Sequence, residues 1–384
     1  MLLLEHDAKE LVRNRGVPVP AGIFVDSQSV DDMQLEGTGA WVVKAQVRAG
    51  GRGKAGGVGF AASTHEVADF IRTHANTSIK GQAVAGFRVE RKIAFTHEVY
   101  LSFVIDPEQR GVRVLLSAQG GMDVEEHAQQ QDAMLTTVAA PDEASLVAAA
   151  STLLPRLPDE LHQPLAAAIV SLAAAFIAFD ATLLEVNPLF VLADGTCIAG
   201  DLKLSLDENA FSRQPELERV VRSRPKVYRE ANFKLDHDFD YVEIDREGQI
   251  GLLTTGAGLS MMLIDEMLQA GRRPFNFCDV RTGLLRGSPT RLIEVLKQFT
   301  RGPNISVVLV NIFAGITDLG EFAQLLLQAL DAVPEITVPI VARLIGNNFA
   351  AAKTLIEQTG RPITVEVDLD QALKLAIEQA GVTA

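Results

Sequence analysis

The C-terminal part of the sequence alternates strand-like and helix-like segments, and this alternation restricts the possible folds more than any other feature. Five strand-like segments are each followed by one with helical periodicity: 250–254 and 259–269, 275–278 and 290–299, 306–311 and 319–332, 340–344 and 349–359, 364–367 and 369–379. Strands that alternate with helices form a parallel sheet with helices on both faces. The sequence therefore predicts an α/β domain with a doubly wound, flavodoxin-like sheet.

Three loops of this domain follow strands at the edge where such sheets bind ligands. Each loop precedes a helix, whose free N–H groups and positive dipole end favour a carboxylate or phosphate. The loops are 255–258 (TGAG), 313–317 (FAGIT) and 346–348 (GNN). Short loops of this kind are also common as plain connectors, so the prediction of an anion site depends on the rest of the chain.

The N-terminal half contains a loop rich in glycine and cations. A short apolar strand ends at Lys44 and leads into AQVRAGGRGKAGGVG at 45–59, with Gly51, Arg52 and Gly53 near its centre. Glycine lets backbone N–H groups approach an anion, and arginine and lysine supply the charge. The pattern is neither GxxxxGK[ST] nor a strand followed by GxGxxG. It predicts a phosphate site, although a mobile surface turn could have the same composition.

The rest of this half predicts a mixture of helices and strands. Helices are expected at 5–15, 29–35, 64–75, 145–154 and 163–179, and strand composition occurs in 23–25, 41–44, 58–61, 87–105 and 112–117. Glu90 and Glu98 fall in the longest strand-like segment. Their even spacing would place both on one face of a continuous strand, whereas a bend between them would separate them.

A hairpin is predicted at 183–204, with its turn at 193–195. Glu185 and Asn187 lie on its first strand, and Asp201 and Lys203 on its second. Proteins hold Mg²⁺ through one or two such side-chain oxygens together with phosphate oxygens. A solvated polar edge is the alternative for the hairpin alone, but together with the glycine loop it predicts a nucleotide–Mg²⁺ site.

The length of the chain indicates how many domains it forms, and its net charge indicates which partners it can bind. A chain of 384 residues is expected to form more than one domain. We place the boundary in the polar passage 207–239, which gives domains at 1–232 and 240–384. The net charge of -14 repels nucleic acid and anionic membranes, so neither is an expected partner. An anionic substrate must then meet a local basic pocket.

A cytoplasmic location is expected for three reasons. Met1–Leu4 is followed at once by charged residues, unlike a targeting peptide. The most apolar run, 165–179, is shorter than a membrane span of about 20 residues and predicts a buried helix. Only two cysteines are present, and neither has a metal-binding spacing, which fits a reducing compartment.

Short segments spread over nearly the whole chain resemble the β subunit of succinyl-CoA synthetase and related ADP-forming acyl-CoA ligases. The segments are WVVKAQVRAGGRGKAGG at 41–57, LLEVNPL at 183–189, DLKL at 201–204, NAFSRQPEL at 209–217, GAGLSM at 256–261, NIFAGI at 311–316 and ARLIGNN at 342–348. The resemblance implies an N-terminal ATP-grasp domain and a C-terminal flavodoxin-like CoA-ligase domain. It also implies ATP as a substrate and Mg²⁺ as a cofactor.

The resemblance assigns roles to residues of this chain by motif. Nucleotide binding is implied for Lys44, Gly51, Arg52, Gly53, Glu90 and Glu98, metal binding for Asn187 and Asp201, and a catalytic position facing a phosphohistidine for Glu185. That histidine belongs to a separate α subunit in this family. The histidines of this chain agree with such a division, because none lies in the loops expected to form the acyl-transfer site. The resemblance thus implies half of an enzyme, whose α partner carries the phosphohistidine and the CoA site.

The acid-binding loops depart from the family pattern. The resemblance implies that the substrate contacts Thr255, Arg281, Gly315, Ile316 and Thr317. Thr255 stands where the family usually has Asn, DVRTGL at 279–284 replaces DVGGGA, and Ala314 replaces the second glycine of NIFGGI. The added cation at Arg281 predicts a small acid other than succinate with a second anionic or strongly polar group. Alternatively, Arg281 points to solvent or pairs with a carboxylate of the partner subunit.

Three functions remain to be compared. The favoured one is an enzyme subunit that, with its α partner, makes an acyl-CoA from a small carboxylic acid, CoA and ATP. A non-catalytic or regulatory subunit would keep the fold, but retention of Lys44, Glu185, Asn187 and Asp201 argues against it. An ATP-grasp ligase acting alone on an amine is disfavoured by the flavodoxin-like half.

Overall fold

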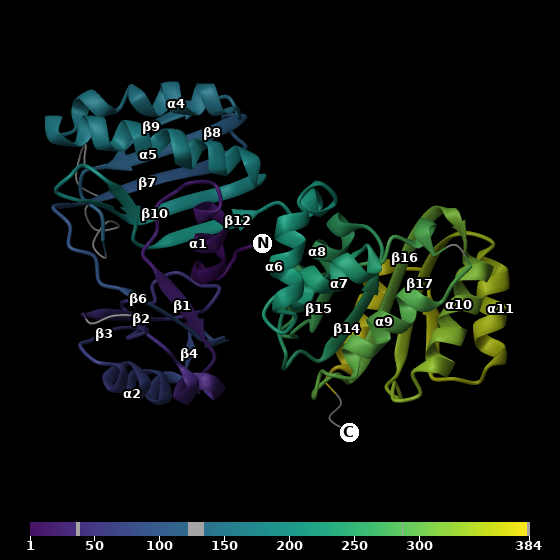
Figure 1. Ribbon diagram of the computed structural model, residues 1–384. Coiled ribbons are helices and arrows are strands. Elements are labelled where there is room, and N and C mark those ends of the chain that lie inside the picture. Colours follow the sequence, from purple (N-terminus) through teal and green to yellow (C-terminus); the bar gives the residue numbers. More distant parts are fainter. Residues whose placement is uncertain (36–38, 122–133, 286, 382–384) are drawn as a thin grey trace. The chain divides into compact units, whose positions relative to one another are not determined.

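The computed structural model describes residues 1–35, 39–121, 134–285 and 287–381. The chain divides into two compact units, Met1–Val227 and Tyr228–Ala384. Each unit has its own sheets and helices and is described by itself (Figure 1).

The first unit contains an antiparallel sheet that carries the glycine loop. Its strand order is β1 (Gly22–Val25), β6 (Phe87–Arg91), β2 (Trp41–Ala45) and β3 (Val58–Ala61). Helix α2 (Thr64–His74) packs on one face through Val67 and Ile71, and the glycine loop joins β2 to β3. Ser63 caps α2 by accepting the N–H of Glu66. The predicted helix at 29–35 is instead the 3-10 helix η1 (Ser27–Asp32), and β4 (Ser78–Ile79) and β5 (Gln82–Ala83) form a small ribbon.

A second antiparallel sheet lies in the same unit. Its order is β11 (Cys197–Ala199), β10 (Ala181–Val191), β7 (His97–Asp106), β8 (Gly111–Ser117) and β9 (Leu135–Ala139), and β12 (Leu202–Leu206) also pairs with β10. Helices α4 (Glu143–Ser151) and α5 (Asp159–Ala178) cover one face (Figure 1). The predicted hairpin is therefore present, with its second limb divided into β11 and β12 around Gly200 and Asp201.

The strand-like segment 87–105 does not form one strand. The N–H of Lys92 donates to the carbonyl of Ala40, directly before β2 of the first sheet, whereas the N–H of Thr96 donates to that of Val191 in the second. The chain therefore crosses from one sheet to the other between these residues. The bend anticipated as an alternative is the observed one, and it puts Glu90 and Glu98 on different sheets.

The N-terminal helix links the two sheets. Residues before α1 (Glu5–Arg13) bond to β12, through the N–H of Leu3 to the carbonyl of Leu204. Helix α1 then lies between the sheets (Figure 1), and its Lys9 reaches Glu90 of β6 as well as the carbonyl of Gly200. The remaining helical elements of this unit are η2 (Leu154–Arg156), η3 (Glu208–Arg213) and α6 (Pro215–Ser223).

Helix α5 contains the most apolar run of the chain. Among the described residues it is the one helix long and apolar enough to cross a membrane, with 39% of its most apolar window buried. Its buried side chains, which include Leu165, Ile169, Leu172 and Phe176, repeat at helical spacing. One face of α5 therefore packs against the sheet, as predicted for a core helix.

The second unit contains the predicted parallel sheet. Its order is β14 (Ile250–Thr254), β16 (Val307–Asp318), β17 (Ile340–Asn347) and β18 (Ile363–Glu366), all parallel. Strand β15 (Asn276–Asp279) runs beside β14 and pairs antiparallel with β13 (Asp240–Glu243). The side chain of Asn276 joins β15 to β14, because its Oδ1 accepts from the N–H of Leu252 and its Nδ2 donates to the carbonyl of Leu252.

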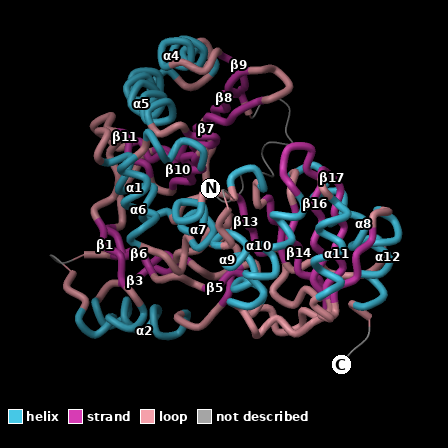
Figure 2. Tube along the Cα trace, turned by 90° about the vertical axis from the view of Figure 1, so that its right-hand side faces the viewer, coloured by secondary structure: helices cyan, strands magenta, loops and turns pink. Residues whose placement is uncertain are grey.

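Helices cover both faces of this sheet, as a doubly wound fold requires. One core contains residues of α9 (Thr290–Phe299), α10 (Leu319–Ala332) and α11 (Phe349–Gln358). The opposite core contains residues of α8 (Ala257–Gln269) and α12 (Leu369–Gln379), which lie side by side (Figure 2). Helix α7 (Arg229–His237) and the 3-10 helix η4 (Thr282–Leu284) complete the unit.

Two of the three predicted ligand loops are wrong as loops, because β17 continues through Gly346 and Asn347 and β16 continues through 313–317. Residues 313–317 belong to β16, which pairs with β17 as far as Ala314 and again at Asp318. The register shifts between these two residues, so Gly315, Ile316 and Thr317 form a bulge in the strand. A bulge at the end of a strand still turns side chains out of the sheet, and Ile316 is 95% exposed.

Candidate active site

The glycine loop folds tightly around Arg52. Gly51 and Gly56 have positive φ angles of 78° and 74°, which favour glycine. The carbonyl of Arg52 accepts from the N–H of Gly57 at 2.9 Å, and its side chain turns inward until only 7% is exposed. A Cβ at Gly51 would lie 3.2 Å from Lys80 Nζ. The loop thus presents bare backbone next to cations, as a phosphate site requires.

Lys44 belongs to a group of buried charges that we call the charge cluster: Glu5, Lys9, Lys44, Arg52, Arg88 and Glu90, with Asp201 at its margin. Lys44 Nζ lies 3.0 Å from Glu5 Oε1 and 2.7 Å from Glu90 Oε1, and donates to the carbonyl of Gly200 at 2.6 Å. Four cations thus face the three carboxylates of the cluster, and Glu10 adds a fourth carboxylate 3.4 Å from Arg88 Nη1.

Arg52 connects the glycine loop to the hairpin. Its Nη2 lies 2.8 Å from Glu5 Oε2, and donates to Asp201 Oδ1 and Oδ2 at 2.8 and 2.9 Å. Two residues predicted for different roles, a phosphate ligand and a metal ligand, are therefore in direct contact. The predicted residues Lys44, Arg52, Glu90 and Asp201 come together in one site.

The charge cluster keeps its members ionised. Burial alone would raise the pKa of Glu5, but its cationic neighbours, led by Arg52, hold that pKa well below its ordinary value. Burial alone would lower the pKa of Lys44, but the carboxylates of Glu5 and Glu90 raise it above its ordinary range. Lys44 is therefore a permanent cation, suited to an anionic ligand.

The predicted catalytic residue Glu185 lies on β10, between two partners. Its Oε1 is 2.5 Å from Lys203 Nζ, and its Oε2 accepts from the hydroxyl of Tyr100 at 3.3 Å. A Cβ at Gly50 would lie 3.3 Å from Lys203 Cε, so this lysine also lies against the glycine loop. Glu185 is thus held beside the loop by a lysine that is itself 40% exposed.

Asn187 and Glu98 meet at Gly121. The N–H of Gly121 donates to Asn187 Oδ1 at 2.6 Å, and Asn187 Nδ2 donates to the Gly121 carbonyl at 3.2 Å. A Cβ at Gly121 would lie 2.8 Å from Glu98 Oε2. Burial raises the pKa of Glu98. Glu98 therefore lies on the second sheet near the predicted metal ligand Asn187, whereas Glu90 lies in the charge cluster of the first sheet.

The donors available to a metal are oxygens. Among the described residues no group of three or more His, Cys, Asp or Glu side chains could hold a metal ion. Asn187 and Asp201 are adjacent, because the N–H of Asn187 donates to the carbonyl of Asp201 at 3.0 Å. One amide oxygen and one carboxylate fit Mg²⁺, which binds few protein ligands and completes its octahedron with phosphate oxygens and water.

The predicted acid-binding residues gather at the carboxyl ends of β14, β15 and β16. The N–H of Thr255 donates to the carbonyl of Asn311, and Thr317 donates through its hydroxyl to that of Thr282. The N-terminus of α8 has no side-chain cap, whereas the carboxylate of Asp318 caps α10. A carboxylate also lies at the start of α8, because the N–H of Gly256 donates to Asp279 Oδ1 at 3.0 Å.

Arg281 occupies a strained position with two acidic neighbours. Its φ of 49° is left-handed, where the family pattern has glycine. Its Nη2 donates to Asp240 Oδ2 at 2.9 Å, and its Nη1 lies 4.0 Å from Asp238 Oδ1. Its side chain is 39% exposed. Carboxylates of its own chain thus neutralise part of its charge, an arrangement that sequence analysis did not consider.

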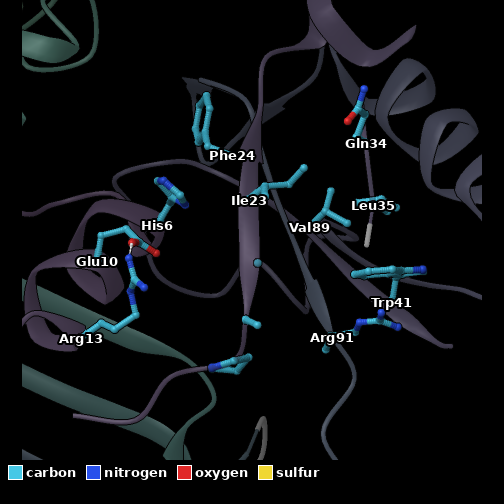
Figure 3. Close-up of a pocket in the computed structure, with 13 residues that line it drawn as sticks. His6, Glu10, Arg13, Ile23, Phe24, Gln34, Leu35, Trp41, Val89 and Arg91 are labelled. Carbon is cyan, nitrogen blue, oxygen red and sulfur yellow. Dashed lines mark hydrogen bonds and ion pairs between the residues drawn. The ribbon is translucent and has the colours of Figure 1, made fainter. Parts of the chain in front are cut away.

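A cavity of about 810 Å³ lies beside α1 and β1 (Figure 3). Trp41, stacked against the guanidinium of Arg91, and Leu35 line it on one side of β1, and His6 and Glu10 line it on the other. None of the predicted site residues is among those that line this cavity. The candidate site is therefore the charge cluster and the hairpin rather than this cavity.

Sequence reasoning missed several members of the site. Glu5 and Lys9 are on the first predicted helix, and Arg88 and Tyr100 are on strands. A signal for two of them was present, because Glu5 and Lys9 are one turn apart and in register with the apolar Ala8 and Val12. Charges on the apolar side of a helix indicate a buried polar network.

Comparisons with known proteins agree with both units. A family model described as an ATP-grasp domain matches residues 2–191, and one described as CoA-ligase matches residues 253–378. Fold, site and family models together define the class: an ATP-grasp domain followed by a CoA-ligase domain, as the sequence predicted.

Relatives identify the family. The β subunit of ADP-forming succinate–CoA ligase from Cupriavidus pinatubonensis is 33% identical over 394 residues, covering 99% of this chain and 99% of the relative. That from Chloroflexus aurantiacus is 36% identical over 366 residues, covering 94% of each. The chain belongs to the family of ADP-forming succinate–CoA ligase β subunits and is an acid–thiol ligase component.

A solved structure has the same fold over the whole chain. ATP citrate lyase from Methanothrix soehngenii, in complex with citrate and coenzyme A, superposes with a TM-score of 0.75. The match covers 98% of this chain and 99% of the other, at 18% sequence identity. At this identity the likeness concerns the fold alone.

Proposed function

We propose that the chain is the β subunit of an ADP-forming acyl-CoA synthetase, which binds Mg–ATP and phosphorylates a histidine of a separate α subunit. The completed enzyme converts a small carboxylic acid and CoA to acyl-CoA, with release of ADP and phosphate. The observation that carries the proposal is a pair of contacts: Lys44, directly before the glycine loop, contacts Glu90, and Arg52, within the loop, contacts Asp201.

The chain contributes charge rather than a nucleophile. Phosphoryl transfer needs little covalent chemistry from the protein, and catalysis comes from positioning and electrostatic stabilisation. Lys44 and Arg52 are kept ionised by their neighbours, and burial protects them from screening by salt. We assign them to the phosphate oxygens, with the backbone of Gly51 and Gly53 alongside.

Asn187 and Asp201 hold Mg²⁺ in this proposal. The ion neutralises charge on the phosphate oxygens when it is bound. Arg52 orients Asp201 by contacting both of its carboxylate oxygens, and Gly121 orients the amide of Asn187. Glu98 binds the nucleotide from the neighbouring strand.

Glu185 receives the partner's phosphohistidine. Its two oxygens are already oriented by Lys203 and Tyr100, which leaves the carboxylate fixed for an incoming imidazole. Within the described part of the chain, His6 touches the charge cluster, but Arg88 contacts its Nδ1 at 2.8 Å. We propose that the phosphoryl carrier comes from an α subunit, since the relatives are named as β subunits, and that the complex is cytoplasmic.

The acid binds in the second unit, next to Thr255, Arg281 and the bulge of Gly315, Ile316 and Thr317. Arg281 supplies a cation that shares Asp240 with Lys234. An acid with a second anionic or strongly polar group would compete for this guanidinium. We therefore propose a small acid of that kind in preference to succinate.

Reconstitution tests the function. The chain alone should bind Mg–ATP in a calorimetric titration but make no acyl-CoA. With the α subunit it should form acyl-CoA and release ADP in a screen of small mono- and dicarboxylic acids. Acyl-CoA formed by this chain as the only protein would refute the two-subunit proposal, and the absence of Mg–ATP binding would refute the nucleotide site.

A further inference from the structure

Helix α1 carries two charged residues into the interior. Glu5 is 3% exposed and Lys9 is not exposed at all. We propose that Glu5 and Lys9 are positioning residues that set the placement of Lys44 and Arg52 toward the phosphates of the nucleotide. This inference depends on the nucleotide site proposed above and adds α1 to it.

The two lysines share their acceptors. Lys9 Nζ lies 2.7 Å from Glu5 Oε1 and 2.9 Å from Glu90 Oε2, and donates to the carbonyl of Gly200 at 2.7 Å. Lys44 contacts the same two carboxylates and the same carbonyl. Both ammonium groups contact these acceptors. Lys9 therefore holds in place the same oxygen atoms that position Lys44.

One carboxylate spans the two phosphate cations. Glu5 Oε1 contacts Lys44, and Glu5 Oε2 lies 2.8 Å from Nη2 of Arg52. The separation of these two cations is therefore set by a side chain of a third element. Gly200 holds both lysines and directly precedes Asp201, so the same contacts also locate the predicted metal ligand.

Stability alone does not explain such an arrangement. Replacing a buried ion pair by apolar residues of similar volume is often neutral or stabilising, because desolvation of the charges offsets their attraction. Helix α1 already packs through Ala8, Leu11 and Val12. The charged pair is therefore explained better by the geometry that it imposes on its partners.

The proposal predicts a division between binding and chemistry. Glu5→Gln keeps the size of the side chain but removes a negative charge beside the phosphate cations. Electrostatic attraction for Mg–ATP then does not fall, whereas Lys44 and Arg52 lose the group that sets their spacing. A misplacement of about 1 Å can slow an enzymatic step by up to ~100-fold.

Asp7 supplies a matched control on the same helix. It is 6% exposed and pairs with Arg224 at 2.9 Å, outside the charge cluster. Asp7→Asn therefore also removes the charge of a buried carboxylate on α1. It should leave the rate of phosphoryl transfer unchanged.

The experiment compares wild type, Glu5→Gln, Lys9→Met, Lys9→Arg and Asp7→Asn in the complex with the α subunit. Three quantities are measured: the unfolding midpoint, the Kd for Mg–ATP and the single-turnover rate of histidine phosphorylation. Glu5→Gln should transfer at least about tenfold more slowly, with Kd unchanged or lower. Lys9→Met should also be at least about tenfold slower, and Lys9→Arg should recover part of the rate.

The outcomes separate the two proposals. Wild-type transfer rates in folded Glu5→Gln and Lys9→Met would overturn the positioning role and leave the nucleotide site intact. Loss of rate in Asp7→Asn equal to that in Glu5→Gln would overturn it too, because the effect would then follow stability. If Glu5→Gln does not fold, Lys9→Met and Lys9→Arg decide by the same criteria. Failure of the wild type to bind Mg–ATP would overturn the proposed function itself.

Discussion

Replacement of Lys44 tests whether the charge cluster supports the fold as well as the chemistry. Lys44→Met keeps a long, unbranched side chain but removes an ammonium that contacts Glu5, Glu90 and the carbonyl of Gly200. Removing one partner of a buried ion pair costs about 3 to 5 kcal/mol, because the other charge is left uncompensated. Lys9 still contacts both carboxylates, so we expect the lower end, about 3 kcal/mol.

Asp201→Asn is the comparison. The side chain of Asp201 is 31% exposed, and its partner Arg52 keeps Glu5 and the carbonyl of Ala45. The expected loss is about 1 kcal/mol, typical of a pair that water can reach. Both variants should nevertheless lose phosphorylation of the α-subunit histidine, because each removes a proposed ligand of Mg–ATP.

The single tryptophan makes the assay specific to the first unit. Trp41 lies on β2, is 6% exposed and is stacked against the guanidinium of Arg91. Its fluorescence during urea unfolding therefore follows the sheet that carries Lys44. With an m-value of about 3 kcal/mol per molar, the midpoint of Lys44→Met should fall by about 1 M, and that of Asp201→Asn by about a third of this.

Three results would refute the reasoning. An unchanged urea midpoint for Lys44→Met would show that the buried charges contribute no stability through this lysine. Phosphorylation at the wild-type rate by either variant would remove that residue from the nucleotide site. Equal midpoints for the two variants would contradict the difference in burial between Lys44 and Asp201.

Three further predictions concern pH, a glycine and the acid site. Burial and two nearby arginines lower the pKa of His6 from 6.5 to about 4, so its protonation opposes folding. The free energy of unfolding should have its full value above pH 6.5 and fall by up to about 3 kcal/mol toward pH 4. In the His6→Gln variant this dependence of the unfolding midpoint on pH should disappear. Gly121→Ala should weaken Mg–ATP binding in calorimetry, because its Cβ would meet Glu98 Oε2 at 2.8 Å. Gly16 has a similar positive φ but free space around it, so Gly16→Ala should lower stability without affecting Mg–ATP binding. Equal weakening of Mg–ATP binding in the two variants would contradict the role of the contact with Glu98. Arg281→Gly should change the ranking of acids in competition kinetics. Its Tm should change little, because relief of about 1 kcal/mol of backbone strain offsets the loss of the partly exposed ion pair with Asp240. An unchanged ranking, or succinate as the best substrate of the wild type, would refute the substrate proposal.

Local patterns were sufficient for most of the fold. Residues 319–332 and 369–379 form α10 and α12 with the predicted bounds. Their apolar residues repeat at helical spacing, and Asp318 and Asp368 cap them through their own side chains. Alternation of such segments with strands is enough to predict a parallel sheet.

Prediction was weakest where a pairing partner decided the structure. The segment 313–317 has the composition of a loop, but β17 extends β16 through it. Similarly, 87–105 has strand composition throughout, yet its two parts belong to different sheets, because one hydrogen-bonds to Ala40 and the other to Val191. Hydrogen bonding to distant strands is not encoded in local periodicity.

The sequence by itself determined the class of chemistry, because the glycine loop and the oxygen-bearing hairpin require particular residue types at particular spacings. Only the tertiary structure decided which charges meet. Glu5 and Lys9 are far in sequence from Lys44, Glu90 and Asp201, and α1 brings them within hydrogen-bonding distance of the cluster. Coulomb energy in a buried site depends on separations of a few ångströms, and the packing of α1 between two sheets sets those separations.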